Sequence, residues 1–323
     1  MQVNERRLQV SERQHVDKLQ VSERQISTSE GCWYLPVAMK SKTSSNLSTD
    51  AATRLQQLLE ARVKRPLLKS APEPKQMPLW PSSRRAVPNE FARSALFTCA
   101  GQREPRAKLD GSEPIVSTAG FELYYSGEEL RQDDLDLWLQ VVDMAQGSDL
   151  VHQVEFTAST MLTLLGWGLG EASYQRLRDT MKRLNRGHIA IIYDGGQEDT
   201  GGAMLLKVKS WRGKETRGQK WWALIDRELV SVFRPDMTLL DWETRRQLGP
   251  LAKWLHTFYS SHREPHPIKV ETLYRLCGSK ASALRTFRAA LKDAVTALVD
   301  IGFLVPGSGI ERPSDHLVVR RVR

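Results

Sequence analysis

The sequence predicts an α+β protein with two winged-helix domains in tandem, each a helix-turn-helix with a β wing, and a disordered region at its N-terminus. Three observations lead to this prediction. The order helix, short helix, long helix and strand pair occurs twice along the chain; the first eighty or so residues have linker composition; and 323 residues, of which 40% are hydrophobic, are enough for about two domains. We place the N-terminal region at 1–79, the first winged-helix domain at 80–240 and the second at 241–323.

The N-terminal region is polar and repetitive. The motif LQVSERQ occurs at 8–14 and again at 19–25, which is too short a unit for a solenoid repeat. Residues 36–90 are rich in Ser, Pro and Lys, as linkers are, with one weakly amphipathic helix expected at 50–65. We therefore predict a disordered or linker region, with the repeats either a disordered tail or a duplicated stretch of coding DNA.

The first copy begins with a strand at 121–127. A helix follows at 133–146, because Leu135, Trp138, Leu139 and Val142 recur at helical spacing. Further helices are expected at 157–168 and at 171–187, where Gly187 ends the second of them. Strands are then expected at 188–194 and 203–211, and the segment 220–233 begins as a strand while its second half also allows a helix.

The second copy repeats this order. We expect a helix over 243–261 that is interrupted or entered at Pro250, a short helix at 269–278 and a long helix at 280–302. Two strands around a Gly and Pro turn then fill 303–322. Cys277 and Gly278 fall at the tight turn of the helix-turn-helix.

The segment YSSHREPHPIKVETLYRLCGS places His262, Glu264 and His266 close together and so raises the alternative of a zinc site. That chemistry needs both imidazoles on one face of an unbroken helix with a third ligand nearby. Pro265 and Pro267 break the helix, and the glutamate is in the wrong position. We therefore expect no metal and no cofactor, and, since no catalytic set of residues stands out, no enzymatic activity.

The formal net charge of +9 and a pI near 9.5 give the chain a long-range positive field that attracts polyanions, nucleic acid first among them. No run approaches the roughly 18 apolar residues of a membrane helix, and the N-terminus has no apolar signal core. The three cysteines, Cys32, Cys99 and Cys277, are odd in number and far apart, which indicates reduced thiols. We therefore predict a cytoplasmic protein without a membrane partner.

The long helix of each copy has an apolar stripe and a basic face, which is typical of a helix that reads double-stranded DNA. A basic face that is merely solvated is the alternative. In the second copy the stripe is Leu284, Phe287, Leu291, Ala294 and Leu298, and the predicted DNA contacts are Lys280, Ser282, Arg285, Arg288 and Lys292, with Arg320 and Arg321 in the wing. In the first copy the stripe is Tyr174, Leu177, Met181 and Leu184, and the predicted contacts are Arg176, Arg178, Lys182 and Arg183.

Three segments carry a family resemblance: WPSSRRAVPNEFARSALF at 80–97, SGEELRQDDLDLWLQVV at 126–142, and LGPLAKWLHTFYSSHREPHPIKVETLYRLCGS at 248–279. From about Trp80 to its C-terminus the chain resembles the TrfA family of plasmid replication initiators. The resemblance implies a bacterial initiator that binds repeated iterons at a plasmid origin and opens the adjacent A·T-rich DNA. The partners that it implies are the host replication initiator, the host helicase and the sliding clamp, together with a homodimer that binds the origin poorly.

Two rival functions remain open. A winged-helix transcriptional repressor shares the fold and the DNA contact, and the two are hard to separate from sequence alone. An enzyme using the histidines and Glu264 belongs to a different class and would be detected by metal analysis. An initiator gene, unlike a repressor gene, should lie beside direct repeats and an A·T-rich segment.

The segment QMPLW at 76–80 resembles a clamp-binding peptide, in which a glutamine is followed by two variable residues, a leucine and an aromatic residue. Gln76, Leu79 and Trp80 match that order, and a flexible segment can place such side chains in an apolar groove. Alternatively, Trp80 packs against the first winged-helix domain. The sequence leaves both interpretations open.

Overall fold

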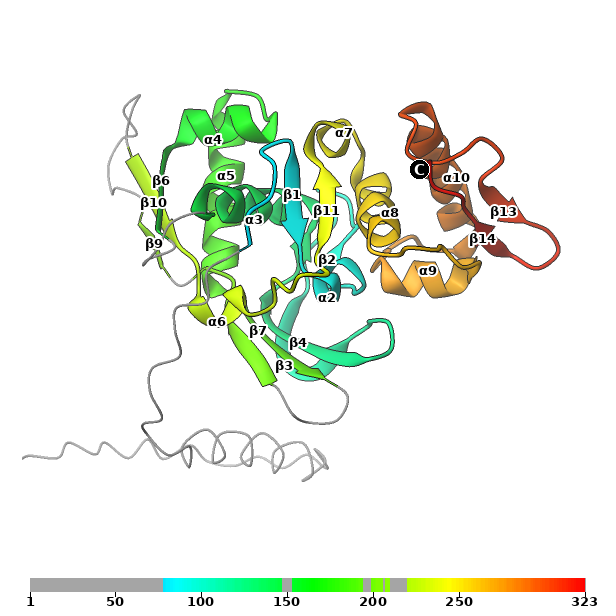
Figure 1. Cartoon of the computed structure of the whole chain (residues 1–323), viewed down its shortest axis with the longest axis horizontal. Coiled ribbons are helices and arrows are strands. Elements are labelled where there is room, and N and C mark those ends of the chain that lie inside the picture. The colour runs from blue at the N-terminus through cyan, green and yellow to red at the C-terminus, as the bar shows by residue number, and fades with distance from the viewer. Residues whose placement is uncertain (1–77, 147–152, 194–198, 206, 210–219, 323) are drawn as a thin grey trace, which may run out of the picture. The chain divides into compact units, whose positions relative to one another are not determined.

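The structure, a computed structural model, describes residues 78–146, 153–193, 199–205, 207–209 and 220–322 (Figure 1). The predicted disorder of the N-terminal region, its repeats and the helix expected at 50–65 lie outside these residues. The fold is mixed α+β. Its buried apolar side chains form two clusters, a first core drawn from residues 80–242 and a second core drawn from residues 248–319. The predicted boundary between 240 and 241 falls close to this division and stays a prediction.

The first core is built around three helices, and their limits follow from local chemistry. Helix α3 begins where the Asp134 side chain accepts a hydrogen bond from the Arg131 amide, and its predicted apolar stripe is buried. Helix α4 is capped by Thr157 and ends at Gly166 in the left-handed region, while α5 ends at Gly187 as predicted. The bounds are Gln132–Ala145 for α3, Ala158–Leu165 for α4 and Glu171–Arg186 for α5.

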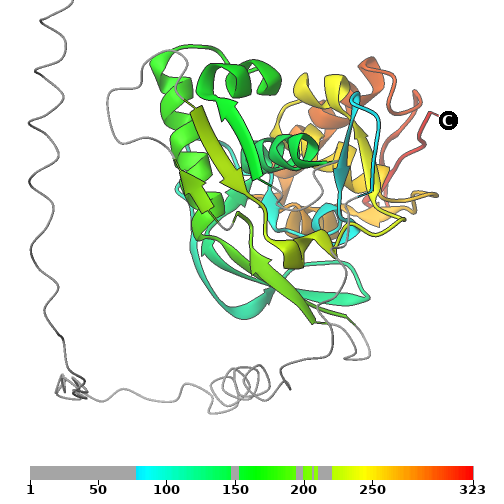
Figure 2. The same cartoon turned by 60° about the vertical axis from the view of Figure 1, so that its left-hand side comes forward.

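A four-stranded antiparallel sheet in the order β3-β4-β7-β8 packs against α5 through β4 and β8 (Figure 2). Its strands are β3 (Lys108–Ile115), β4 (Phe121–Glu128), β7 (His188–Tyr193) and β8 (Asp199–Ala203). A second sheet has the order β6-β10-β9, from β6 (Gln153–Thr157), β10 (Lys220–Leu224) and β9 (Lys207–Lys209). The short helix α6 (Arg227–Val230) follows β10, so the segment 220–233 does change from strand to helix.

The prediction of a single strand at 203–211 is wrong, because the chain leaves one sheet and enters another in this segment. Strand β8 ends at Ala203, and the buried Met204 and Leu205 separate it from β9. The Met204 carbonyl accepts a hydrogen bond from the Trp138 indole at 3.1 Å. The chain therefore turns toward α3 at this point. The apolar residues Met204 and Leu205 look like part of one continuous strand in the sequence, so the break is not predicted.

Ordered structure starts earlier than the linker composition indicated. Strand β1 (Arg84–Val87) pairs with β11 (Thr238–Asp241), and β2 (Phe97–Thr98) pairs with β5 (Leu130–Arg131); helix α2 (Asn89–Ala92) lies between β1 and β2. Val87 is fully buried although Pro and Ser surround it in sequence. Burial of a few apolar side chains, rather than composition, decides this region.

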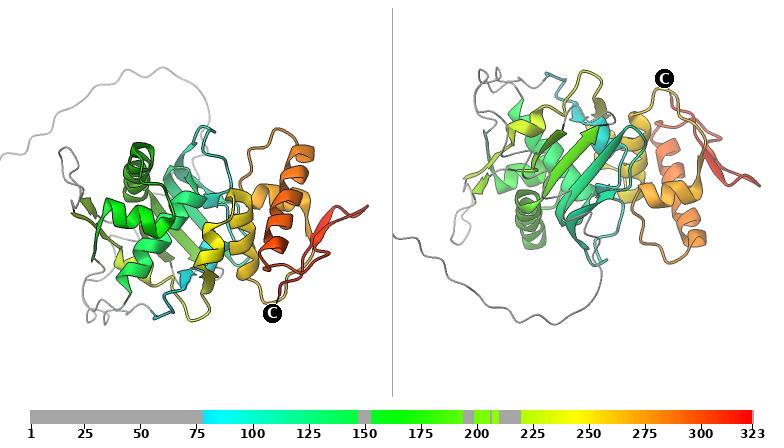
Figure 3. Two further views of the ribbon diagram at one scale, coloured as in Figure 1. Left: turned by 90° about the horizontal axis from the view of Figure 1, so that it is seen from above. Right: turned by 90° about the horizontal axis from the view of Figure 1, so that it is seen from below.

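Helix α7 (Trp242–Arg246) follows β11, and its Trp242 belongs to the first core. The second core is built from α8 (Pro250–Ser260), α9 (Val270–Leu276) and α10 (Leu284–Asp300) (Figure 3). Its antiparallel sheet has the order β12-β14-β13, from β12 (Ile268–Lys269), β13 (Gly309–Glu311) and β14 (His316–Val318). Pro250 opens α8, and Gly278 makes the turn between α9 and α10 with φ of 60°. Across the described residues, no helix is long and apolar enough to cross a membrane.

Trp80 lies in the first core. Its indole Nε1 donates to Asp143 Oδ1 at 2.9 Å, its amide donates to the Gln146 side chain at 3.1 Å, and its ring stacks on Phe233. Leu79 beside it is 76% exposed, whereas Gln76 lies outside the described residues. The placement of Trp80 matches the packing alternative, and clamp binding by this segment stays a prediction.

Candidate nucleic-acid interface

Helix α10 separates an apolar face from a basic one. Phe287, Leu291 and Leu298 are at most 1% exposed, which confirms the predicted stripe. Arg285 and Lys292 are exposed and lie seven residues apart, so they share a face two turns long. Ser282, just before the helix, is exposed as well. The structure thus presents two cations and a hydroxyl of the predicted DNA contacts to solvent.

Arg288 lies between this face and the C-terminal hairpin formed by β13 and β14. Its Nε and Nη2 donate to the two carboxylate oxygens of Asp315, at 2.8 and 2.7 Å. This bidentate hydrogen bonding lowers the pKa of Asp315 and raises that of Arg288. Because Asp315 belongs to the hairpin turn, Arg288 fixes the hairpin relative to α10. Its predicted contact with DNA stays a prediction.

Lys280 lies in the segment that leads into α10, and its ammonium group contacts the first core. It donates to the Pro105 carbonyl at 2.8 Å and to the carboxylate of Glu129, which is 3% exposed. Burial opposes ionisation of Glu129, but hydrogen bonds from Lys280, the Ala107 amide, Arg131 and Thr98 outweigh it and lower its pKa to about 2. Lys280 therefore holds the start of α10 against the first core.

The two arginines predicted in the wing differ in their surroundings. Arg320 is exposed after β14. Arg321 donates to the backbone carbonyls of Tyr259 and His262, at 3.1 and 2.9 Å, and fastens the chain end to α8. Arg312 is exposed in the turn of the C-terminal hairpin. It was not among the predicted DNA contacts, although the turn ERPSD places a basic residue between two predicted strands.

Helix α5 is the predicted DNA-reading helix of the first core. Two of its predicted DNA contacts donate hydrogen bonds to acidic residues of α3. Arg183, 11% exposed, donates to Asp134 at 2.9 Å, and Arg176 donates to Asp133 at 3.2 Å. The Arg176 guanidinium also lies 3.8 Å from the centre of the Trp167 ring. These two arginines hold α5 onto α3 in this structure, and their contact with DNA stays a prediction.

The other two predicted DNA contacts of α5, Arg178 and Lys182, pair with acidic residues of α5 itself. Arg178 donates to Glu171 at 2.8 Å and to Gln175. The Lys182 side chain is 60% exposed, the largest exposure among the four predicted contacts of this helix, and lies 3.7 Å from Asp179. An exposed ion pair of this kind contributes little and can exchange its partner for a phosphate.

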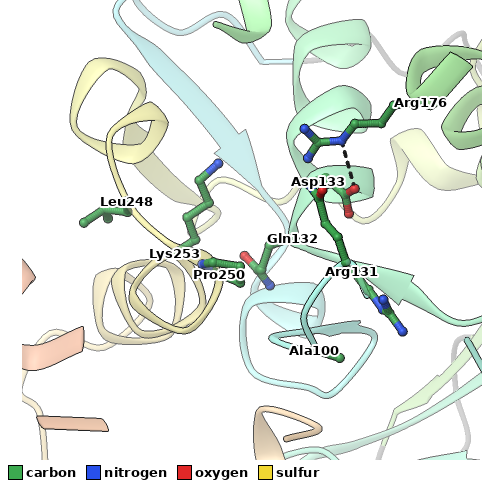
Figure 4. A pocket seen from close by; sticks show the side chains of 9 residues that line it. Ala100, Arg131, Gln132, Asp133, Arg176, Leu248, Pro250 and Lys253 are labelled. Atoms are coloured by element: carbon green, nitrogen blue, oxygen red, sulfur yellow. Dashed lines mark hydrogen bonds and ion pairs between the residues drawn. The ribbon is translucent and has the colours of Figure 1, made fainter. Parts of the chain in front are cut away.

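A small pocket of about 170 Å³ lies where the two cores meet (Figure 4). It is lined by Ala100, Gln102, Arg131, Gln132, Asp133, Arg176, Leu248, Pro250 and Lys253. Its cations already have acceptors: Arg131 donates to the Gly101 carbonyl, Arg176 to Asp133, and Lys253 to Asp136. An anionic ligand in this pocket would have to displace those acceptors.

A buried ionic network joins the two cores, and sequence reasoning missed it. Arg245, fully buried, donates to Asp136 at 2.7 Å, to Gln132 at 2.9 Å and to Thr257 at 2.7 Å. Lys253 shares the same carboxylate. An isolated buried charge is costly, so a complete set of partners is required around Arg245. The sequence shows these residues but not their proximity.

The histidine segment takes part in backbone contacts. His262 Nδ1 lies 2.7 Å from the Phe258 carbonyl oxygen at the end of α8, while His266 is exposed. In the part of the chain that the structure describes, no group of three or more His, Cys, Asp or Glu side chains is arranged to hold a metal ion.

Comparisons with known proteins identify relatives. The family model of the TrfA protein matches residues 44–310. The plasmid replication initiator protein TrfA of Escherichia coli is 33% identical over 229 residues, which cover 70% of this chain and 59% of that protein. The chain thus spans about three-fifths of that relative's length.

Two crystal structures of RctB domains 2 and 3 are similar at lower identity. One is 14% identical with a TM-score of 0.46, covering 62% of this chain and 81% of the other. The second, of selenomethionine derivatives, is 12% identical with the same TM-score of 0.46 and covers 70% and 87%. On the family model and the Escherichia coli relative together, this chain belongs to the TrfA family of plasmid replication initiators.

Proposed function

We propose that the chain is a plasmid replication initiator that binds directly repeated iterons in double-stranded DNA through two winged-helix domains. The observation that carries the proposal is α10, whose buried stripe leaves Arg285 and Lys292 exposed beside the C-terminal hairpin. Short exposed side chains between them, at Thr286 and Ala289, let a helix approach base edges closely. Membership of the TrfA family supports the same function.

The order of elements supports a winged helix in each half. Around the second core, α8, β12, α9, α10, β13 and β14 follow one another, and β14 pairs with both other strands. Around the first, α3, β6, α4 and α5 precede β9 and β10, and β10 pairs with β6 and β9. In this interpretation α10 and α5 are the reading helices, and the hairpins β13–β14 and β9–β10 are the wings.

Two different reading helices have a consequence for the DNA site. Each half of the site is read by a different helix, so no palindrome is needed. Two insertions into the major groove on one face of DNA lie about 10 to 10.5 bp apart, and a site of roughly 20 bp repeated head to tail follows. Phosphate contacts from Lys182, Arg312 and Arg320 would set the register.

We further propose that the bound chain opens adjacent A·T-rich DNA together with the host initiator, and that it recruits the host helicase and sliding clamp. A homodimer that binds the origin poorly would limit initiation. These partners rest on family membership, and the clamp contact rests also on the exposed Leu79.

The decisive test is replication. A DNA fragment carrying the gene and its flanks, joined to a selectable marker without another origin, should yield plasmid-bearing colonies. Breaking the reading frame should abolish them, and the intact gene in trans should restore them. If purified chain binds repeats in the flanks but the fragment never replicates, the chain is a repressor and the initiator proposal fails.

A further inference from the structure

Cys99 and Cys277 come from segments far apart in the sequence, and both side chains lie at the second core. Cys99 follows β2, and Cys277 ends α9. The Cys99 amide donates to the Cys277 carbonyl at 2.8 Å. One backbone hydrogen bond of this length keeps the two Cα atoms within about 7 Å of each other, which is the upper limit for a disulfide.

The residues on both sides hold this contact closely. A Cβ atom added at Gly278 would lie 2.6 Å from the Thr98 methyl group, so the segments around Thr98 and Gly278 are in close contact. Lys280, three residues after Cys277, donates to Glu129 in the first core. Burial and then the side-chain hydrogen bond with Cys99 raise the pKa of the Cys277 thiol, whereas Cys99 is only partly buried.

We propose that Cys99 and Cys277 form a reversible disulfide under peroxide, one that covalently joins the segment after β2 to the end of α9. Peroxide oxidises the less buried Cys99 sulfur first: an S–O bond forms, the O–O bond breaks and one water leaves. The Cys277 sulfur then attacks the Cys99 sulfenic acid, the S–S bond forms, and the hydroxyl leaves as a second water after taking up the thiol proton. This inference does not depend on the proposed DNA function.

The test uses the full chain with Cys32→Ser, because Cys32 lies outside the described residues and must not compete. Hydrogen peroxide is added to folded protein, the reaction is stopped by alkylation, and peptides are mapped by mass spectrometry without reduction. We expect a peptide pair joined through Cys99 and Cys277, a fall from two free thiols per chain to none, and full recovery with dithiothreitol. The thermal midpoint of the oxidised form should rise, since the bond closes a long loop.

Matched variants distinguish the specific Cys99–Cys277 disulfide from random oxidation of thiols. Cys99→Ser is the first control, since its half-buried position tolerates a hydroxyl; it should retain one thiol and give no linked peptide. Cys277→Ser should do the same if it folds, and the proposal does not depend on it. Peroxide that converts Cys99 to sulfinic acid with no linked peptide, or that links two chains through Cys99, would overturn the proposal.

Discussion

Replacing Glu129 with glutamine should remove a pH-dependent part of the stability of this chain. In the folded state the Glu129 carboxylate accepts hydrogen bonds from Lys280, Arg131, Thr98 and the Ala107 amide, which hold its pKa near 2 against an ordinary value of 4.5. Because the folded-state pKa is depressed, the stabilisation is fully present above the unfolded-state pKa and is lost as the pH falls toward 2.

The size of the effect follows from those two pKa values. At pH 7 the ionised carboxylate contributes about 3 kcal/mol to the free energy of unfolding, and at pH 3.5 about 2 kcal/mol remains. The wild-type chain should therefore lose about 1 kcal/mol more than Glu129→Gln between these pH values. Any cost of the glutamine that does not depend on pH cancels in this comparison.

Urea unfolding at pH 7, 5 and 3.5, followed by circular dichroism, measures the difference. Glu113→Gln is the matched control, because it makes the same change of side chain at an exposed position of β3. A wild-type minus Glu129→Gln difference that stays constant from pH 7 to 3.5 would show that the carboxylate is not held ionised by its partners, and the reasoning would fail.

The other predictions concern the faces of α10 and the N-terminal edge of the first core. Arg285→Ala should weaken binding to the cognate repeat by about 1 to 3 kcal/mol for a base contact, or lower the salt slope by about one for a phosphate contact, whereas Lys108→Ala on β3 should change neither in a gel-shift titration. Leu291→Asp should unfold the second core, since it buries an unpaired charge; a cooperative wild-type melt would contradict the face assignment. Leu79→Ala should weaken binding of the purified host clamp without changing the melt, and Trp80→Ala should lower the melt; unchanged clamp affinity in the first variant counts against recruitment.

Helix positions were predictable wherever the signal is local. The apolar stripe of α10 repeats at helical spacing, Gly187 ends α5, and Pro250 opens α8, and each of these predictions is confirmed. Such signals depend on residues within one or two helical turns of one another, so they do not depend on the tertiary arrangement. Strands β1 and β11 pair although about half the chain separates them in sequence, and no local sequence signal predicts that pairing.

The surroundings of the basic residues were not predictable, because a helical wheel gives a face but not what covers it. Arg183 and Arg285 look alike in sequence: each lies one step off an apolar stripe. In the structure Arg183 donates to Asp134 of α3, whereas Arg285 is exposed. The acceptors are Asp133 and Asp134 at the start of α3, 43 and 49 residues away in sequence from the arginines that they bind.

The two proposed reading helices, α5 and α10, therefore use their cations differently. In α5, Arg176 and Arg183 pair with carboxylates that burial would otherwise penalise. Drawing both arginines toward DNA would leave Asp133 and Asp134 to share the one guanidinium of Arg106. In α10, Arg285 and Lys292 face water, so moving them to DNA breaks no protein contact of that kind. On this argument the second core should supply more of the favourable cation-to-DNA contacts, while the first core uses its cations mainly to hold α5 in place.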